Sequence, residues 1–348
     1  MKRVLRLLRA VVSLAAIFVL LSCGGSPLPT PEPKASPTIA LSNPNARLDE
    51  NALVGRILFV QRGSIWMWEN NAGHLLMGGG VAWQPRWSPD GSRVAYIERG
   101  MSYSDLIVID AQGKPVNQLT FNGSERMPGS IERVYESSWV FYPAWAPDGK
   151  QLLMAAQYGP PAGDPAVEYN LALYSVPAVG CNKRLVYADD GGQCGRSAYA
   201  PDGTTIALTL AKTGRDGTQR IYRVASTTGE VAPWAGLPAS SYDPAFSPDG
   251  RFLAFAARDG ERTDIFALPI ASSAQPQRLT VLGTARAPTF SPDGRFIAFL
   301  AIPEGKGGFE LWVAAISSTP DGALTMSPPR QVTRDLGLDG DSGLSWGL

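Results

Sequence analysis

The sequence is poor in the residue types on which most catalytic and metal sites depend. Its 348 residues include a single histidine, His74, and only three cysteines. Most catalytic triads and many metal sites need a histidine, and His74 follows a turn-forming stretch, 70–73, where a surface position is expected. Cys181 and Cys194 stand apart with no second pair at zinc-ligand spacing. We therefore predict no metal, no cofactor and no enzymatic activity.

The sequence also lacks an excess of charge of either sign. It has 31 Lys and Arg residues against 31 Asp and Glu residues, so nothing indicates a nucleic-acid partner. The 37 Gly and 29 Pro residues are typical of a fold with many tight turns rather than long helices. A chain of this length and a hydrophobic fraction of 44% can bury a sizeable core.

The long apolar run is confined to the N-terminus. Four Lys or Arg residues within the first nine positions precede the apolar stretch 10–21, which is short for a membrane span. The stretch ends L-L-S-C at Cys23 and resembles the lipobox of bacterial lipoproteins, in which the cysteine is lipidated. The resemblance implies a signal peptide at 1–22 and a lipid anchor to a bacterial membrane, on the extracytoplasmic side of the cell envelope. The alternative is an ordinary secretory signal that contains a cysteine.

Residues 23–52 are rich in Pro and Ser and show no hydrophobic periodicity. Such a segment cannot bury enough apolar surface to order itself. We therefore predict a disordered, extended tether, which at about 3.1 Å per residue would hold the following domain several nanometres from a membrane.

The remaining sequence, 53–348, is built from a repeated unit. The segment FSPDGRFLAF at 246–255 recurs as FSPDGRFIAF at 290–299. More divergent copies occupy 87–96, 145–154 and 199–208. The Pro-Asp-Gly triplets begin at positions 89, 147, 201, 248 and 292. A period of this length indicates a propeller or an array.

Each copy is predicted to form a β-hairpin whose turn is the Pro-Asp-Gly triplet, because Pro presets φ, Asp bonds its own backbone and Gly accepts positive φ. Two further β-runs follow in each copy, which gives four antiparallel strands, the content of one propeller blade. In the copy at 199–208 the fourth run, 231–234, is poorly marked. A calcium site would need converging oxygens, so we assign turn capping to Asp90, Asp148, Asp202, Asp249 and Asp293.

The two ends of the chain complete a further blade. Near the N-terminus, the runs 57–61, 65–69 and 74–77 resemble the second to fourth strands of a unit. At the C-terminus, 343–347 matches the aromatic-bearing first strand. The sequence therefore predicts an all-β, six-bladed propeller closed by strands from both ends in one shared blade.

The repeated unit, aromatic-Ser/Ala-Pro-Asp-Gly-x-x-apolar-Ala-aromatic, resembles the TolB-type propeller repeat, also called the PD40 or WD40-like repeat, over residues 53–348. TolB carries an α/β domain ahead of its propeller, and here the tether 23–52 occupies that place. Related peptidases carry an α/β-hydrolase domain for which we expect no room. The resemblance implies protein partners in the cell envelope, without a Tol-Pal role.

Three further motifs receive structural interpretations. G-L-S-W-G at 343–347 matches a nucleophile elbow, but that motif needs a downstream histidine, so we assign Ser345 to the closing strand. Cys181 and Cys194 flank an outer strand, and we predict a disulfide contributing about 3 kcal/mol; the alternative is two unrelated thiols. The acidic stretch D-G-D-S at 339–342 is interpreted as a solvated loop. The repeat aromatics are expected in the core.

Two insertions are not needed to build a blade, and such loops on a rigid scaffold often carry binding residues. The first, 122–138, joins an outer strand to an inner one and is expected at the channel mouth. The second, 158–168, joins two strands of the next blade and is expected on the opposite face. Passive loop elaboration is the alternative. The candidate binding residues are Arg126, Arg133, Tyr135, Glu136 and Trp139.

These observations predict a non-catalytic binding or scaffold module, anchored to a membrane, whose partner is a protein of the cell envelope. One alternative is a sensor of a small molecule or a cell-wall fragment. Another is an accessory propeller or hydrolase acting on peptides or sugars. Propellers host all of these functions, so the side chains in the channel must decide among them.

Overall fold

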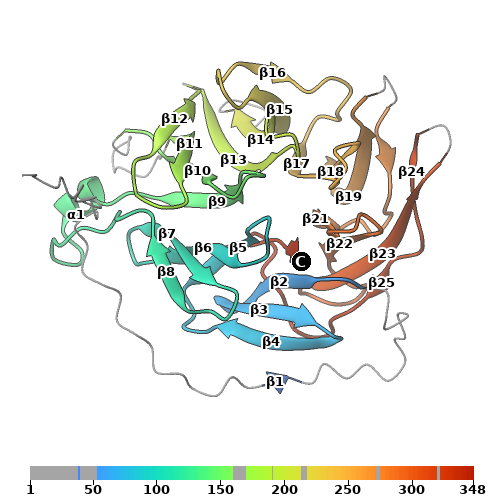
Figure 1. Cartoon of the computed structure of the whole chain (residues 1–348), viewed down its shortest axis with the longest axis horizontal. Coiled ribbons are helices and arrows are strands. Elements are labelled where there is room, and N and C mark those ends of the chain that lie inside the picture. The colour runs from blue at the N-terminus through green and yellow to red at the C-terminus, as the bar shows by residue number, and fades with distance from the viewer. Residues whose placement is uncertain are drawn as a thin grey trace, which may run out of the picture.

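The computed structural model describes residues 38–39, 53–159, 170–189, 191–212, 218–271, 275–319 and 322–348. These residues form six antiparallel sheets of four or five strands, arranged as blades around a central axis (Figure 1). The predicted six-bladed, all-β propeller is therefore confirmed. The described part contains one α-helix, α1 (Ile131–Glu136), and no helix long and apolar enough to cross a membrane. The predicted signal peptide and Cys23 lie outside the described residues.

The first three blades follow one another from the N-terminal side, and each runs from an inner strand at the axis to an outer strand. The first blade contains β26 (Ser345–Gly347), β2 (Arg56–Gln61), β3 (Ser64–Glu69) and β4 (Ala72–Met77). The second contains β5 (Ala82–Trp87), β6 (Arg93–Arg99), β7 (Ser104–Asp110) and β8 (Pro115–Gln118). The third contains β9 (Val140–Trp145), β10 (Gln151–Gln157), β11 (Leu171–Pro177) and β12 (Arg184–Tyr187).

The last three blades repeat this order. The fourth contains β13 (Gly192–Tyr199), β14 (Thr205–Lys212), β15 (Gln219–Ala225) and β16 (Val231–Pro233), the strand that the sequence marks poorly. The fifth contains β17 (Ser241–Phe246), β18 (Phe252–Asp259), β19 (Arg262–Pro269) and β20 (Gln277–Arg278). The sixth contains β21 (Arg286–Phe290), β22 (Phe296–Ala301), β23 (Glu310–Ser318), β24 (Leu324–Met326) and β25 (Arg330–Gln331), the last two both pairing with β23.

The first blade is shared by the two ends of the chain, as predicted. β26 pairs with β2, with Arg56 opposite Gly347, and the Trp346 indole N–H donates to the Val54 carbonyl oxygen at 2.9 Å. One feature differs from the expected tether, because β1 (Thr38–Ile39) adds to the outer edge of this blade by pairing with β4. The rest of residues 23–52 lies outside the described residues.

The Pro-Asp-Gly turns have the predicted geometry. In all five, an Asp carboxylate oxygen accepts the backbone N–H two residues later, at 2.9–3.1 Å. The five glycines have φ between 67° and 72°, which only glycine adopts without strain. In Asp90, hydrogen bonds from Ser88 and Ser92 lower the carboxyl pKa to about 2. These turns share one face of the disc, which we call the turn face.

The hydrophobic core lies between neighbouring blades rather than around the axis. Ile97 and Leu106 of the second blade, for example, share a buried cluster with Trp145 and Leu152 of the third. The aromatic residue of each repeat unit packs into such a cluster, as predicted, because strand alternation turns it toward the neighbouring sheet. Burial on both faces explains why the second and third strands of each blade are almost uninterrupted apolar runs.

A buried acid fastens the outer strand in three blades, and sequence reasoning did not identify it. In each, the acid near the start of the third strand accepts a threonine hydroxyl from the segment after the fourth, at 2.6–2.8 Å. It also accepts a backbone N–H from the following loop. The acid–threonine pairs are Asp105 with Thr120, Asp264 with Thr280, and Glu310 with Thr333.

The predicted disulfide between Cys181 and Cys194 is wrong, because Cys194 is a free, buried cysteine. Cys194 lies on β13 within the apolar cluster between the third and fourth blades. Cys181 follows β11, whose end Pro177 pairs with Gln151 beside the turn face, whereas Cys194 is near the opposite end of its strand. Burial raises the pKa of the Cys194 thiol to about 12, which makes it unreactive at neutral pH.

Candidate functional site

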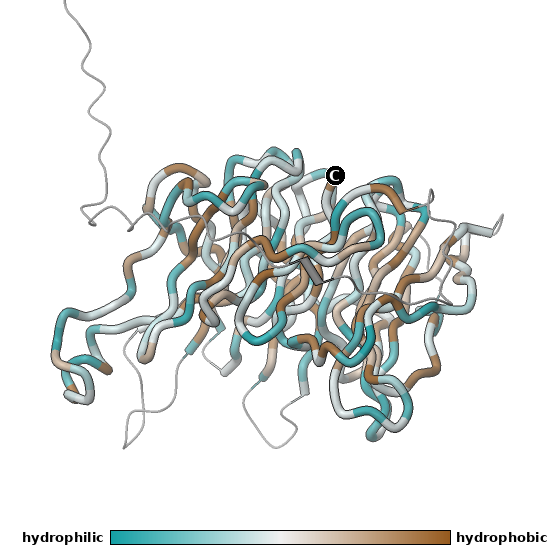
Figure 2. The backbone as a smooth tube through the Cα atoms, turned by 90° about the horizontal axis from the view of Figure 1, so that it is seen from below, coloured by the Kyte–Doolittle hydropathy of each residue, from teal (hydrophilic) through white to brown (hydrophobic). Residues whose placement is uncertain are grey.

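A funnel of 540 Å³ opens at the turn face around the propeller axis. Each repeat unit contributes an aromatic residue and, two positions later in five blades, a proline, so the repetition itself arranges these groups in a ring. The C-terminal residue Leu348 also lines the funnel, and Figure 2 shows the C-terminus at this face of the disc. The lining aromatics are Trp87, Trp145, Tyr199, Phe246, Phe290 and Trp346, and the prolines are Pro89, Pro147, Pro201, Pro248 and Pro292.

The residue just before each aromatic also lines the funnel. Five blades carry a small residue there, and the second blade carries Arg86 instead. The Arg86 Nη1 atom donates to the carbonyl oxygens of Pro85 at 2.7 Å and Ser342 at 3.3 Å, so the side chain reaches from the second blade to the segment that precedes β26. The small residues are Ala144, Ala198, Ala245, Thr289 and Ser345.

A second ring, three positions before the aromatics, forms where the inner strands change register. Four of its residues have φ of 53–55° although none is glycine, namely Gln84, Tyr142, Asp243 and Ala287. Such conformations cost about 1–3 kcal/mol each and persist only where neighbouring contacts hold them. One such contact is the bond from the Tyr142 backbone N–H to the Gln84 side-chain oxygen, at 2.7 Å.

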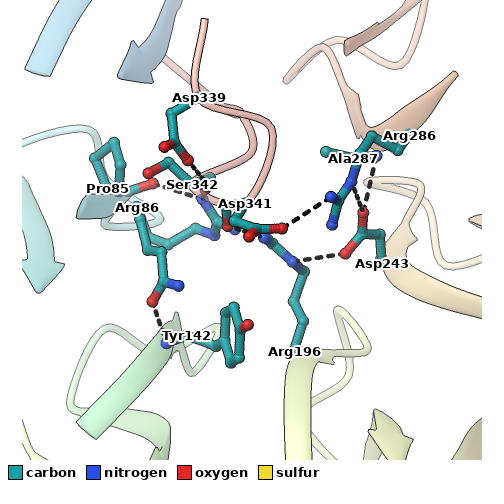
Figure 3. Close-up of polar contacts among 11 residues, drawn as sticks. Pro85, Arg86, Tyr142, Arg196, Asp243, Arg286, Ala287, Asp339, Asp341 and Ser342 are labelled. Carbon is teal, nitrogen blue, oxygen red and sulfur yellow. Dashed lines mark hydrogen bonds and ion pairs between the residues drawn. The ribbon is translucent and has the colours of Figure 1, made fainter. Parts of the chain in front are cut away.

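An arginine–aspartate network joins this ring at the axis (Figure 3). One Asp243 carboxylate oxygen is 3.0 Å from Arg196 Nε, and the other is 3.2 Å from Arg286 Nε. The Ala287 N–H also donates to Asp243, at 3.1 Å. The side chains of Arg196 and Asp243 are only 8% and 5% exposed. Three successive blades, the fourth to the sixth, are therefore tied together by one buried carboxylate.

The surroundings of Asp243 favour its charged form. Burial raises the pKa of Asp243, but the guanidinium groups of Arg196 and Arg286 outweigh burial, and the resulting pKa lies below the ordinary value of 3.8. Arg286 also pairs with the Asp341 carboxylate at 2.8 Å. Burial lowers the pKa of Arg286, but Asp243 and Asp341 raise that pKa by more, so the net shift is upward. Both groups are charged at neutral pH.

The acidic stretch 339–342 takes part in this network, so its interpretation as a solvated loop is only partly correct. The Asp341 side chain is 70% exposed, but its backbone oxygen accepts from Arg196 Nη2 at 2.7 Å. Ser342 is fully buried, and its N–H donates to Asp339 at 2.6 Å. The stretch lies across the axis (Figure 3), and the funnel lining includes neither Asp341 nor Ser342. The stretch 339–342 therefore crosses the axis beyond the residues that line the funnel.

The first insertion does not lie at the channel mouth, and that prediction is wrong. Helix α1 is at the outer edge of the disc, away from the axis (Figure 1), and on the side away from the C-terminus (Figure 2). The insertion follows β8, which is an outer strand. It therefore lies beside β8 and not beside β9, the inner strand to which it leads. Arg133 fixes it by donating to Ser102 in the connection between β6 and β7, at 3.0 Å.

The structure brings three of the candidate residues of this insertion into contact, and two of them, Arg126 and Glu136, line a second cavity of 530 Å³ at its surface. Arg126 and Glu136 form an exposed ion pair at 2.8 Å, and Arg133 bonds the carbonyl oxygens of Ser124 and Arg126. Tyr135 is 51% exposed. Trp139 stacks on Phe141 at 6.0 Å between ring centroids, at the start of β9.

The second insertion leaves its blade on the face opposite the funnel, as expected, but this is also the face of the first insertion. Residues 160–169 lie outside the described residues, but both ends of the insertion are described. The Gln157 N–H donates to the Trp139 carbonyl oxygen and the Tyr158 N–H donates to the Asn170 carbonyl oxygen, at 2.9 and 2.7 Å. The second insertion therefore leaves its blade beside the end of the first, since second-to-third-strand loops and blade-to-blade connections share a face.

Ser345 and His74 are the residues that motifs single out for catalysis, and they lie on different strands. Ser345 lies on β26, where its Oγ accepts the Trp87 N–H at 3.0 Å. His74 lies on β4, the fourth strand of the first blade, opposite Met67. Within the described ranges, no three His, Cys, Asp or Glu residues are grouped as metal ligands would be.

No family model matches the sequence. A stretch of 211 residues is 27% identical to the uncharacterized peptidase YuxL of Bacillus subtilis (strain 168), over 58% of this chain and 26% of that protein. The chain thus spans about a quarter of the length of this curated relative.

Solved structures resemble the chain in fold. TolB from Acinetobacter baumannii matches with a TM-score of 0.60 and 18% identity, over 84% of this chain and 66% of TolB. Putative TolB from Agrobacterium tumefaciens matches with a TM-score of 0.55 and 16% identity, over 86% of this chain and 100% of that one. A chain of a nidogen/laminin complex gives a TM-score of 0.56 and 12% identity, over 85% and 99%. The TolB-type propeller fold predicted from the repeat is therefore confirmed.

Proposed function

We propose that this protein is a non-catalytic binding module that receives a segment of a partner protein in the funnel at the turn face. The observation that carries the proposal is the funnel lining, a ring of aromatic and proline side chains around a cavity of 540 Å³. Four of the five prolines are exposed. These prolines, with the partly exposed Tyr199 and Phe246, present rigid surfaces that bind a polypeptide at a low cost in side-chain entropy.

The chemistry of the funnel favours binding over catalysis. Its acidic side chain, Asp243, is held between Arg196 and Arg286. A general acid or base needs a titratable group near neutrality, and the surroundings of Asp243 move its pKa away from neutrality. The relative YuxL is named a peptidase, so an accessory role beside a hydrolase is the alternative to test.

The comparisons are compatible with a protein partner. Two of the similar structures are a TolB and a putative TolB, and a third belongs to a nidogen/laminin complex. The lipobox-like ending at Cys23 supports the further proposal that the propeller is anchored to a bacterial membrane, on its extracytoplasmic side, and that the partner is a protein of the cell envelope. Replacing Cys23 by Ala should release the protein from the membrane fraction, and unchanged membrane attachment would refute the anchor.

A pair of matched substitutions tests the funnel. Ala198→Phe adds a benzyl-sized group to the funnel wall, whereas Ala271→Phe adds the same group at an exposed surface position after β19. We expect a partner protein to be captured from detergent-solubilised envelopes by the wild type and by Ala271→Phe, but not by Ala198→Phe. Equal melting temperatures of the two variants would establish that the substitution at Ala198 does not act through unfolding.

Mass spectrometry of the captured partner separates the candidate functions. An intact partner supports a binding module. Cleavage of the partner during incubation with the propeller alone would contradict the non-catalytic proposal. Capture that is equal in both variants would place the binding surface elsewhere and refute the role of the funnel.

A further inference from the structure

We infer that the segment received in the funnel carries a carboxylate and that Arg86 is the group that binds it. This inference rests on the proposed function, because it names the chemistry of the ligand in the same cavity. It is independent of which envelope protein supplies the segment. The carboxylate belongs either to an acidic side chain or to a chain terminus, and the test below separates these two sources.

Arg86 has hydrogen-bonding capacity that the protein does not use. Of its guanidinium atoms, Nη1 donates to the carbonyl oxygens of Pro85 and Ser342. Neither Nε nor Nη2 has a partner among the described residues, and no described carboxylate forms an ion pair with Arg86. These donors belong to a side chain that lines the cavity. An arginine fork with free donors matches the two oxygens of a carboxylate.

Arg86 is also an unusual residue for its position in the repeat. In every other blade the equivalent residue is Ala, Thr or Ser, which is what close packing at the axis requires. One arginine among six equivalent positions breaks the symmetry of the funnel at a single point. A long charged side chain at this position has no structural partner of opposite charge, so ligand binding explains its presence better than packing does.

Ser197 supplies a second, independent observation. It lines the cavity, the residue is only 6% exposed, and its Oγ has no hydrogen-bond partner. A buried hydroxyl without a partner is less stable than one that is hydrogen-bonded. A ligand oxygen at the bottom of the funnel would provide the missing acceptor.

The electrostatics of the cavity favour an anion. Among the described side chains that line it, Arg86 and Arg196 are basic and Asp243 is the single acidic one. The Asp243 charge is already compensated by Arg196 and Arg286. Asp341, which also pairs with Arg286, is exposed to solvent and does not line the cavity. Arg86 therefore carries the charge at the bottom of the funnel that has no counter-ion.

Selection from two random peptide libraries tests this inference. In one library the peptides are fused at their C-terminus, so that only side chains supply carboxylates, and in the other the C-terminus is free. Both libraries are selected on the wild-type protein and on Arg86→Met, and binding in the funnel is established by loss on Ala198→Phe. We expect Asp or Glu to be enriched in the first library, or a free terminus to be required in the second, on the wild type alone.

Selected peptides then give the magnitude. Replacing the bound carboxylate by its amide should weaken binding to the wild type about tenfold or more, since a charge-assisted hydrogen bond contributes about 1.5–3 kcal/mol. The same replacement should have little effect on Arg86→Met. Arg86→Lys, which keeps the charge without the fork, should recover part of the preference.

Two outcomes would overturn the inference, and they are distinguishable. Funnel-dependent peptides without an acidic preference would refute the role of Arg86 and leave the proposed function standing. Failure to select any funnel-dependent peptide from either library would count against the proposed function itself. Melting temperatures of Arg86→Met and Arg86→Lys near that of the wild type confirm that both variants are folded.

Discussion

Asp243 is the group whose replacement should reveal how the propeller is held together at its axis. Asp243→Asn keeps the size of the side chain but removes the negative charge shared by Arg196 and Arg286. Arg196 is then left as a positive charge in a site where its side chain is 8% exposed. Removal of one partner from a buried ion pair costs about 3–5 kcal/mol. We expect the lower end, about 3 kcal/mol, because the Asn oxygen can still accept one hydrogen bond.

This loss is measurable by thermal unfolding followed by circular dichroism. For a domain of this size, about 1 kcal/mol corresponds to roughly 2 °C in melting temperature, so Asp243→Asn should melt about 6 °C lower at pH 7. Asp341→Asn is the matched control, since that carboxylate also pairs with Arg286 but is 70% exposed. Exposed pairs contribute about 0–1 kcal/mol, and the control should melt within about 2 °C of the wild type.

The pH dependence provides a second check on the same residue. The pKa of Asp243 is lower in the folded protein than its ordinary value of 3.8, so the unfolded chain binds the proton more readily. The stabilisation is therefore present above about pH 4 and is lost as the pH falls through the folded-state pKa. The difference between the wild type and Asp243→Asn should shrink below pH 4. Equal melting temperatures at pH 7, or a difference that persists unchanged in acid, would refute the reasoning.

Three further predictions concern the rest of the fold. Asp264→Ala should destabilise the protein by about 2 kcal/mol in urea unfolding, because a buried hydroxyl and a backbone N–H lose their acceptor; the exposed neighbour Asp259→Ala should change stability by less than about 0.5 kcal/mol. Cys194 should not react with a thiol reagent in the native protein and should react in concentrated guanidinium chloride, and rapid native labelling would contradict its burial. Deleting residues 343–348 should abolish cooperative unfolding near the wild-type temperature, and an unchanged melting temperature would contradict closure through β26.

The sequence predicts the fold well because the repeat encodes it locally. The Pro-Asp-Gly turns at Asp90 and its equivalents fix hairpins whatever surrounds them, and the spacing of copies leaves room for two more strands. The match of 343–347 to a first strand then requires closure with the runs at 57–77. These inferences depend on turn chemistry and strand periodicity, which are local properties of the chain.

The site could not be predicted in the same way, because it depends on contacts between distant residues. Arg86 and Asp243 occupy positions that look like ordinary strand residues, and the register shift three positions before the aromatic directs Asp243 to the axis. The sequence does hold one signal of the site. The position before the aromatic is Ala, Thr or Ser in five copies of the repeat and Arg in one. Comparing the copies position by position would have singled out Arg86.

The errors have equally specific causes. The disulfide between Cys181 and Cys194 was predicted from their nearness in sequence. In the fold, Cys181 follows the end of β11 beside the turn face, whereas Cys194 is near the opposite end of β13, so the two thiols lie near opposite faces of the disc. The insertion 122–138 was placed at the channel because it precedes an inner strand, but its contacts with Ser102 hold it at the outer edge. In a propeller, the distance of a loop from the axis depends on the strand it leaves as well as on the strand it enters.

The central claim is that the partner binds at the funnel on the turn face. It is tested most directly by site-specific photo-crosslinking in envelopes, with p-benzoylphenylalanine placed at Tyr199, which lines the funnel, or at Tyr135, which is exposed on the insertion at the opposite side. We predict a crosslinked partner from position 199 and none from position 135. A partner crosslinked from 135 alone would contradict the account and assign binding to the insertion.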